Sequence, residues 1–208
     1  MAITYPLTTP TTSGQQSIKI TPNSVVAVSR SPFTRAIQVQ VHQGQGWDFQ
    51  VTIMSGQRVD LEPWVAFLQK LNGQEGTFKL GDDVNSNPRG AADGAPLIDG
   101  ALQVGNEINI KGASNGTTNY LMEGDWIGFN QATIPRLYKV LADVDSDGSG
   151  NLTVTIWPNV NSATSPADGA IVTTQSPKGI FRLAGNAMPY TIRRGTVYEL
   201  SFRAISEV

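Results

Sequence analysis

Hydrophobic and polar residues alternate in two consecutive stretches of the chain. The segment 37–41 alternates β-branched residues with glutamines, and the segment 47–53 alternates aromatic or aliphatic residues with polar ones. A short glycine-containing connection at residues 42–46 separates them. Two runs of period 2 around such a connection predict a β-hairpin with one buried face. The core positions that this hairpin predicts are Val39, Val41, Trp47 and Phe49.

A helical repeat follows this predicted hairpin. Apolar residues recur at helical spacing on one face, with Leu68 among them. Asp60 suits the N-cap, and Pro63 is tolerated in the first turn, where its missing amide proton would have no intrahelical partner. Asn72-Gly73 is a strong stop signal. The predicted elements are a helix over 61–71 and a short strand over 76–81.

A stretch of different composition comes next, rich in Gly, Asn, Asp and Thr. Residues 82–100 contain turn residues throughout and are expected to form a loop. No helical pattern occurs between this loop and residue 177, and a small β-barrel or sandwich is the natural closure for the short strands expected there. Those strands are expected at 101–110, 117–122, 125–129, 136–142 paired with 151–157, and around 171–172.

The pattern of the first region resumes near the end of the chain. Residues 180–183 form a short apolar run, and the segment 196–205 alternates with Phe202 on its apolar side, which suits pairing with 47–53. A chain that starts a domain, leaves it and returns to it has accepted an insertion, which scaffolds tolerate best at loop tips. The predicted division assigns residues 1–90 plus 178–208 to the scaffold, with a polar N-terminal arm at 1–17, and residues 91–177 to the inserted domain.

Composition supports a mainly β fold. The 208 residues include 39% hydrophobic and 15% charged positions, with 21 glycines and 12 prolines. A net charge of −2 argues against broad electrostatic binding of nucleic acid or anionic membranes. The lack of cysteine excludes disulfides, zinc-thiolate sites and cysteine nucleophiles. No apolar run is long enough to span a bilayer and the first residues do not resemble a secretory signal, so we expect no membrane anchor.

Few residues suggest catalysis. His42, the only histidine, lies at a predicted strand end, where a polar hairpin residue is favoured over a member of a Ser-His-acid triad. The sequence contains no nucleophile elbow, phosphate loop or dinucleotide fingerprint. Its acidic residues cluster in turns, which argues against the paired carboxylates of a glycosidase. We therefore expect no enzymatic activity and no cofactor.

One acidic segment matches the first half of a calcium loop. Asp143, Asp145 and Asp147 precede Gly148 at the spacing of the first oxygen ligands. The match then fails, because Val154 stands where a bidentate glutamate is required. A hairpin tip built from turn residues is favoured, with weak calcium binding as the alternative.

Aromatic residues of the inserted region allow two interpretations. Trp126, Tyr138 and Trp157 could form a platform on which sugar rings stack. Their positions within alternating segments favour packing in a core instead. Trp47 and Trp64 lie on predicted core faces, so packing is expected for both.

Several segments together resemble the distal tail proteins of long, flexible-tailed bacteriophages. They are AFLQKLNGQEGTFKLGD, LIDGALQVGNEINIKG, LMEGDWIGF, RLYKVLADVDSDGSGNLTVTIWP and PKGIFRLAGNAMPYTI, and the resemblance extends from about residue 30 to the end. The resemblance implies a discontinuous N-terminal β-sandwich "belt" domain with one helix. It also implies an inserted small β-barrel similar to the oligonucleotide/oligosaccharide-binding type.

The same resemblance implies a function in assembly. Six copies would form a ring at the virion tail tip that joins the tail tube protein to the baseplate hub and tape measure proteins, with DNA passing through the opening. Such a protein would be made in the host cytoplasm. A sparsely charged surface suits a head-to-tail, cyclic assembly of this kind. The residues expected to pack in the core or the assembly are Val39, Val41, Trp47, Phe49, Leu68 and Phe202.

Two other functions are left open by the sequence. The inserted domain could bind carbohydrate or dock receptor-binding proteins at the tail tip. Alternatively, the chain could be a tube or tube-terminator protein of the same tail. A tube protein should stack into long polymers, whereas a tip adaptor should stop at one or two rings.

Overall fold

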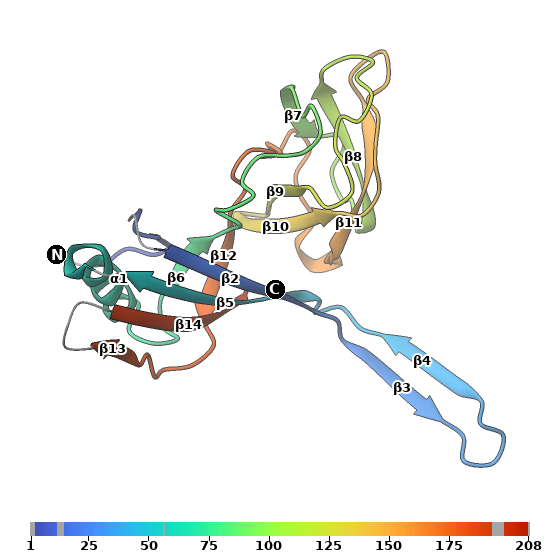
Figure 1. Cartoon of the computed structure of the whole chain (residues 1–208). Coiled ribbons are helices and arrows are strands. Elements are labelled where there is room, and N and C mark those ends of the chain that lie inside the picture. Colours follow the sequence, from blue (N-terminus) through green and yellow to red (C-terminus); the bar gives the residue numbers. More distant parts are fainter. Residues whose placement is uncertain (1–2, 12–14, 56, 193–197, 208) are drawn as a thin grey trace.

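The computed structural model describes residues 3–11, 15–55, 57–192 and 198–207 (Figure 1). The fold is mainly β, with several sheets and one α-helix, as the sequence predicts. In chain order its elements are β1 (Leu7–Thr8), β2 (Gln15–Asn23), β3 (Val26–Arg30), β4 (Ile37–Val41), β5 (Gly46–Ser55), α1 (Arg58–Lys70), β6 (Thr77–Leu80), β7 (Gly94–Ile98), β8 (Gly105–Ala113), β9 (Trp126–Gln131), β10 (Ile134–Val140), β11 (Leu152–Val160), the 3-10 turn Ser162–Thr164, β12 (Gly179–Leu183), β13 (Tyr190–Ile192) and β14 (Tyr198–Ser206).

The first domain is built on a seven-stranded sheet whose main path runs β1-β6-β12-β14-β5-β2, with β13 paired to β14. β6 pairs antiparallel with β12, so the chain leaves this sheet after β6 and returns to the neighbouring position almost a hundred residues later. β5 pairs with β14 over residues 48–55, which confirms the pairing predicted for the segments 47–53 and 196–205.

The core of this domain forms where the inner face of the sheet meets α1. Phe49 of β5 is fully buried, and its neighbour Phe202 on β14 is nearly so. Leu68 reaches the same cluster from the helix, and Trp47 closes it at the end near the second domain. The predicted burial of these four residues is confirmed.

The helix begins earlier than the sequence predicts. It spans Arg58–Lys70 with Gln57 at the N-cap position, so the assignment of Asp60 as the N-cap is wrong. Pro63 consequently lies in the second turn, where the helix lacks the hydrogen bond that an amide proton would have donated. The stop signal is confirmed, because Asn72 and Gly73 both adopt positive φ angles of 51° and 69°.

The predicted hairpin between the segments 37–41 and 47–53 is wrong. β4 pairs instead with β3 in a separate two-stranded sheet. Both edges of β5 are occupied, one by β2 and the other by β14, so β4 has no edge of that strand to join. Val39 and Val41 are therefore not core residues of this chain; their exposed fractions are 60% and 62%.

The second domain contains a five-stranded sheet with the order β7-β8-β11-β10-β9, curled into a half-barrel. The predicted pairing of residues 136–142 with 151–157 is confirmed by β10 and β11. Three details differ from the prediction. β7 lies inside the expected loop 82–100, and the expected strand 117–122 is reduced to a single bridge between Leu121 and Val144. The strand expected around 171–172 is likewise reduced to an isolated bridge between Ile171 and Leu97.

Two clusters of buried hydrophobic residues follow the predicted division of the chain. One cluster lies within the first domain and the other contains residues between Ala92 and Val172. Trp126 and Leu137 are exceptions, because they belong to the second domain in sequence but pack in the first cluster. The boundaries at residues 90 and 178 themselves stay predictions.

Part of the expected N-terminal arm lies against its own domain. β1 pairs in parallel with β6, and the hydroxyl of Tyr5 donates a hydrogen bond to the carbonyl of Lys70 (2.8 Å). Thr9 is buried. Residues 3–11 therefore do not form a free arm, because their apolar side chains find partners on the sheet edge and the helix end; residues 12–14 lie outside the described part of the chain.

Candidate assembly surface and domain junction

The β3–β4 hairpin has one apolar and one polar face. Its register places Val26 opposite Val41 and Val28 opposite Val39. Directly opposed residues share a face, and alternate residues along a strand point to opposite faces. The intervening pairs, Ala27 with Gln40 and Ser29 with Gln38, therefore lie on the other face.

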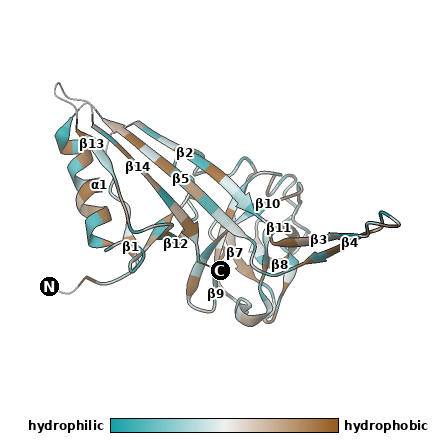
Figure 2. Ribbon diagram, turned by 90° about the horizontal axis from the view of Figure 1, so that it is seen from below, coloured by the Kyte–Doolittle hydropathy of each residue, from teal (hydrophilic) through white to brown (hydrophobic). Residues whose placement is uncertain are grey.

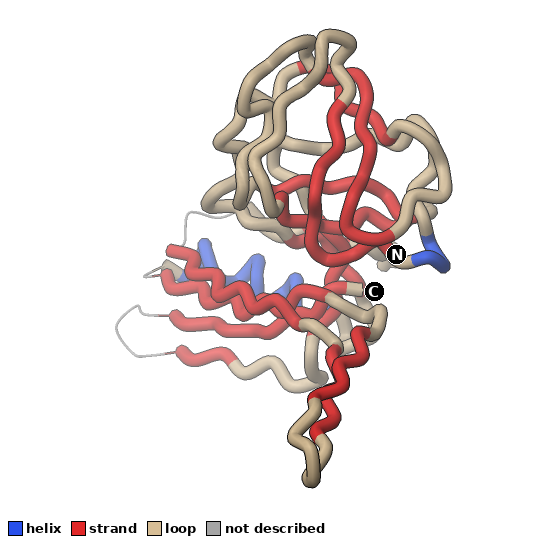
Figure 3. The backbone as a smooth tube through the Cα atoms, turned by 90° about the vertical axis from the view of Figure 1, so that its right-hand side faces the viewer, coloured by secondary structure: helices blue, strands red, loops and turns tan. Residues whose placement is uncertain are grey.

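The apolar face of this hairpin is uncovered. Every residue of β3 and β4 is exposed, and Figure 2 shows hydrophobic positions along the hairpin as well as in the body. Figure 3 shows the hairpin projecting away from both domains. The apolar residues exposed on it, at 44% to 64%, are Val26, Val28, Ile37, Val39 and Val41. We call this set the hairpin face; large exposed apolar patches mark interaction sites.

The tip of the hairpin is an ordered turn with a basic, aromatic surface. The amide of Ser31 donates to the carbonyl of Ala36 (2.9 Å), and the amide of Arg35 donates to the carbonyl of Ser31 (3.0 Å). Phe33 stands at the tip with 94% of its surface exposed. Arg30 and Arg35 flank it, and the segment 24–45 contains no acidic residue. The tip therefore carries positive charge on a chain whose net charge is negative.

A second site is the junction between the two domains, where three tryptophans meet. The ring of Trp47 packs edge-on against Trp126, with centroids 4.8 Å apart, and against Trp157, with centroids 4.4 Å apart. The indole N–H of Trp47 donates to the carbonyl of Leu137 (2.9 Å). Its main-chain amide donates to the hydroxyl of Ser206 (2.9 Å). This one residue therefore links both domains and the last strand.

Polar groups hold Trp126 in place from its other side. Its indole N–H donates to Asp82 (3.2 Å), and the Nζ atom of Lys139 lies 3.9 Å from the centre of its ring. Burial alone would raise the pKa of Asp82, but hydrogen bonds from the following loop and from Trp126 lower it overall. Burial lowers the pKa of Lys139, against the opposing effect of Asp82 and Asp125.

The candidate sugar-stacking residues do not form a platform. Trp126 and Tyr138 are only 5% and 2% exposed. Trp157 is partly buried and packs on Trp47, and the ring of Tyr138 stacks on that of Phe129 with centroids 4.3 Å apart. The interpretation of these aromatics as packing residues is confirmed, because their faces are already covered by other rings.

The three aspartates of the candidate calcium loop serve different turns. Each accepts a hydrogen bond from a main-chain amide of another part of the loop region. The donors are Glu123 to Asp143 (2.7 Å), Asn119 to Asp145 (2.7 Å) and Ser149 to Asp147 (2.8 Å). Hydrogen bonds from Asn151 and Ser149 lower the pKa of Asp147. Within the described residues, no group of three or more His, Cys, Asp or Glu side chains is placed to hold a metal ion.

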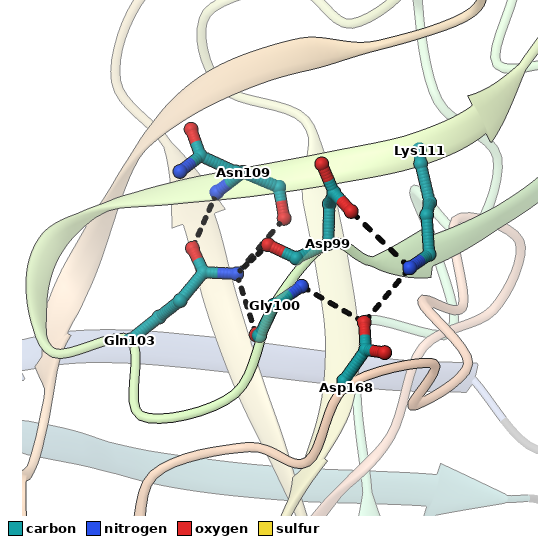
Figure 4. A network of polar contacts seen from close by, with 6 residues as sticks. All are labelled: Asp99, Gly100, Gln103, Asn109, Lys111 and Asp168. Carbon is teal, nitrogen blue, oxygen red and sulfur yellow. Dashed lines mark hydrogen bonds and ion pairs between the residues drawn. The ribbon is translucent and has the colours of Figure 1, made fainter.

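A polar network in the second domain joins β8 to two neighbouring loops (Figure 4). The Nζ atom of Lys111 lies 2.8 Å from Asp168 and 3.1 Å from Asp99. The side-chain amide of Gln103 donates to the carbonyls of Asp99 and Asn109 and accepts from the amide of Asn109 (2.6 Å). The lysine bridges the two carboxylates, so we interpret this cluster as a link that holds the two loops to β8.

His42 lies where the hairpin joins β5, as its predicted place at a strand end indicates. Its side chain is exposed, and its main-chain amide donates to the carbonyl of Val25 (2.9 Å), which closes the base of the hairpin. The hairpin itself is the feature that sequence reasoning missed. The signal for it was the group of valines at positions 25, 26 and 28, which precedes the turn residues Ser31-Pro32.

Comparison of the sequence with protein-family models and with curated proteins finds no match. In the part of the chain that the structure describes, no helix is both long enough and apolar enough to cross a bilayer.

Proposed function

We propose that this protein is a ring-forming structural component of the tail tip of a long-tailed bacteriophage. It would act without catalysis, as a homohexameric adaptor between the tail tube protein and the baseplate hub and tape measure proteins, with DNA passing through the lumen. The resemblance of its motifs to distal tail proteins supports the place in the virion. The observation that carries the proposal of self-assembly is the hairpin face.

Physical chemistry favours covering this face. An isolated two-stranded hairpin is marginally stable in water. Full burial of a Val or Ile side chain contributes roughly 1.5–3 kcal/mol. Burying the exposed parts of Val28, Ile37, Val39 and their neighbours would stabilise a complex by several times the free energy that one such side chain contributes. The entropy cost of association must be subtracted from this gain. A second copy of the chain would supply the covering surface.

The position of the hairpin suits a ring. It projects from one side of the first domain (Figure 1), and we propose that a different surface of the next copy receives it. Contacts between two different patches of one chain are head-to-tail, and they close into rings when the rotation permits. β2, which leads into the hairpin, is also an edge strand of the seven-stranded sheet, and its free edge offers backbone groups to a neighbouring copy.

Charge substitutions on the two faces of the hairpin test the proposal. V28D and V39D place a carboxylate on the apolar face, and S29D and Q38D place the same charge on the opposite face of the same strands. We expect wild-type protein, S29D and Q38D to form rings of six, and V28D and V39D to remain monomeric with an unchanged melting temperature. Native mass spectrometry and negative-stain electron microscopy measure the outcome.

Three results would contradict the proposal. If the wild-type protein stayed monomeric at high concentration, even when mixed with tail-tube protein, the proposal that it forms a ring would be wrong. Rings that survive both V28D and V39D would show that the hairpin face is not the contact. Long polymers in place of one or two rings would favour the alternative of a tube protein.

A further inference from the structure

A cavity of about 200 Å³ lies where the base of the hairpin meets both domains. The segment 41–45 and strand β12 line it from the first domain, and β10 and the end of β11 line it from the second. The side chains that matter for its chemistry are Gln43, Gln45, Gln131, Arg136, Tyr138 and Asn159. The cavity therefore combines one guanidinium, one phenol, several amides and the carboxylate-bearing Glu207, with Leu137 and Phe181 as apolar walls.

Arg136 is a half-buried cation that forms no ion pair with the described residues. One of its terminal nitrogens donates to the carbonyl of Glu207 (2.8 Å), and its Nε atom is buried without a hydrogen-bond partner. The carboxylate of Glu207 is engaged elsewhere, because it pairs with Arg182 at 2.6 Å. Among the described residues, no carboxylate lies within ion-pair distance of Arg136.

Tyr138 is a second unpaired donor beside the same cavity. It is 98% buried, since only 2% of its surface is exposed, and its hydroxyl has no hydrogen bond of normal geometry. Burial raises the pKa of this phenol, and the smaller opposing effects come from Arg136 and from the nearby amide of Gln131. Tyr138 therefore stays neutral and keeps its proton to donate. A buried donor without a partner destabilises the fold, so a ligand that accepts a hydrogen bond from it is favoured.

The donors left unpaired in this region favour an anionic acceptor. Glu207 also lines the cavity, but its carboxylate pairs with Arg182, so among the described residues the guanidinium of Arg136 faces the cavity without an ion pair. Burial lowers the pKa of Arg136, but a guanidinium is not deprotonated in proteins. Shielding from water strengthens the attraction between such a cation and an anion that enters.

We propose that this cavity binds a carboxylate, with Arg136 as its charge partner and Tyr138 as a hydrogen-bond donor. Carboxylates match the planar donor geometry of guanidinium groups better than other small anions of low charge. The surrounding amides would orient the ligand, and the apolar walls would accept a short alkyl group. The carboxylate would come either from a small molecule or from an Asp or Glu side chain of a second copy of this chain. Binding of a free carboxylate does not depend on ring formation.

Titration with acetate and propionate tests the proposal, with acetamide as the neutral probe of matched size. Trp47 lines the cavity, so tryptophan fluorescence and calorimetry can follow binding. We expect saturable binding of the carboxylates at least about tenfold tighter than that of acetamide, because a charge-assisted hydrogen bond is roughly twice as strong as a neutral one. R136Q should lose about tenfold or more in affinity, and Y138F a smaller factor.

Two further variants keep the test decisive. R35Q removes a guanidinium from the hairpin tip, away from the cavity, and should bind as wild type does. R136K keeps the charge but loses the forked geometry, so it should bind between wild type and R136Q even if R136Q folds poorly. Equal affinity for acetate and acetamide, or equal binding by R136Q, R136K and wild type, would overturn the proposal.

Measurements of self-association distinguish the two possible sources of the carboxylate. Sedimentation velocity would compare wild type and R136Q, each with and without saturating acetate. If a neighbouring copy supplies the carboxylate, acetate and R136Q should both weaken association. If the ligand is a small molecule, association should be unchanged while acetate still binds to the wild type.

Discussion

Strands β4 and β5 have almost the same sequence pattern and opposite environments. Both alternate apolar and polar residues, and both were expected to face one core. Phe49 on β5 is fully buried, whereas Val39 on β4 is 60% exposed. The difference lies in what surrounds each strand: β5 has strands on both edges and α1 over one face, and β4 has only β3.

Period-2 alternation therefore reports that a strand has an apolar face, but not that the same chain covers it. The apolar face of β5 is covered by the first domain and, at Trp47, also by the inserted domain. No described part of the chain covers the apolar face of β4, so we propose that a second copy of the chain covers it.

Removal of residues 95–175 should disrupt the first domain itself. The deletion takes away Trp126, Trp157 and Leu137, which pack on Trp47 or accept its hydrogen bond. We expect a chain closed by a short Gly-Ser linker to aggregate or to lose cooperative unfolding, measured by solubility and differential scanning calorimetry. The same deletion carrying Trp47→Gln is the control and should be more soluble. A stable, soluble deletion chain with native Trp47 would show that β5 is covered without the inserted domain.

Alanine substitutions should separate the two strands directly. Phe49→Ala should lower the free energy of unfolding by about 3–5 kcal/mol, because it leaves a cavity in a packed core. Val39→Ala should change it by no more than about 0.5 kcal/mol in monomeric protein, because the side chain is already in water. Urea denaturation at low protein concentration measures both values. Similar losses for the two variants would mean that the hairpin face is covered within the chain.

Coupling between the domains should be measurable at the tryptophan junction. Trp47 and Trp126 pack edge-to-face with their centroids 4.8 Å apart. A double-mutant cycle with Trp47→Ala and Trp126→Ala should give a coupling energy of about 0.5–1.5 kcal/mol. Trp64→Ala, paired with Trp126→Ala, is the control, since Trp64 packs on Phe67 and Phe202 instead. Additive effects for Trp47 and Trp126 would contradict the view that the domains share a core.

The smallest effect is expected at the loop tip of the second domain. In the folded protein, hydrogen bonds from Asn151 and Ser149 hold the pKa of Asp147 below its ordinary value of 3.8. The ionised carboxylate therefore stabilises the fold above pH 3.8, and this contribution is lost as the pH falls through the lower folded value. Asp147→Asn should flatten the pH dependence of the melting temperature in that acid range, and Asp143→Asn serves for comparison. If the melting temperature of Asp147→Asn fell with pH in the same way as that of the wild type, the stabilising contribution assigned to Asp147 would be wrong.

Much of the fold was predictable because it depends on local patterns. Helical periodicity predicts α1 to within a few residues, and Asn72-Gly73 ends it because both adopt positive φ angles. The apolar side of the last strand predicts its pairing with β5. The N-cap was missed because Gln57 occupies that position without a side-chain capping hydrogen bond, whereas Asp60 lies inside the first turn.

The candidate sites were less predictable, since they depend on which segments meet. Trp126 and Trp157 were correctly interpreted as packing residues, but their partner Trp47 belongs to the other domain. Arg136 and Tyr138 carry no sequence motif at all. They become a candidate site only because the hairpin base and β12 enclose them on one side of a cavity.

The mainly β class, the helix, the insertion and the two faces of each alternating strand could all be predicted from the sequence, because they follow from local propensity and periodicity. Which apolar face is buried could not be predicted in this way, because burial depends on long-range pairing. In the tertiary structure β5 pairs with β2 and β14, whereas β4 pairs only with β3. The same long-range pairing brought the three tryptophans together and left the hairpin face open to a partner.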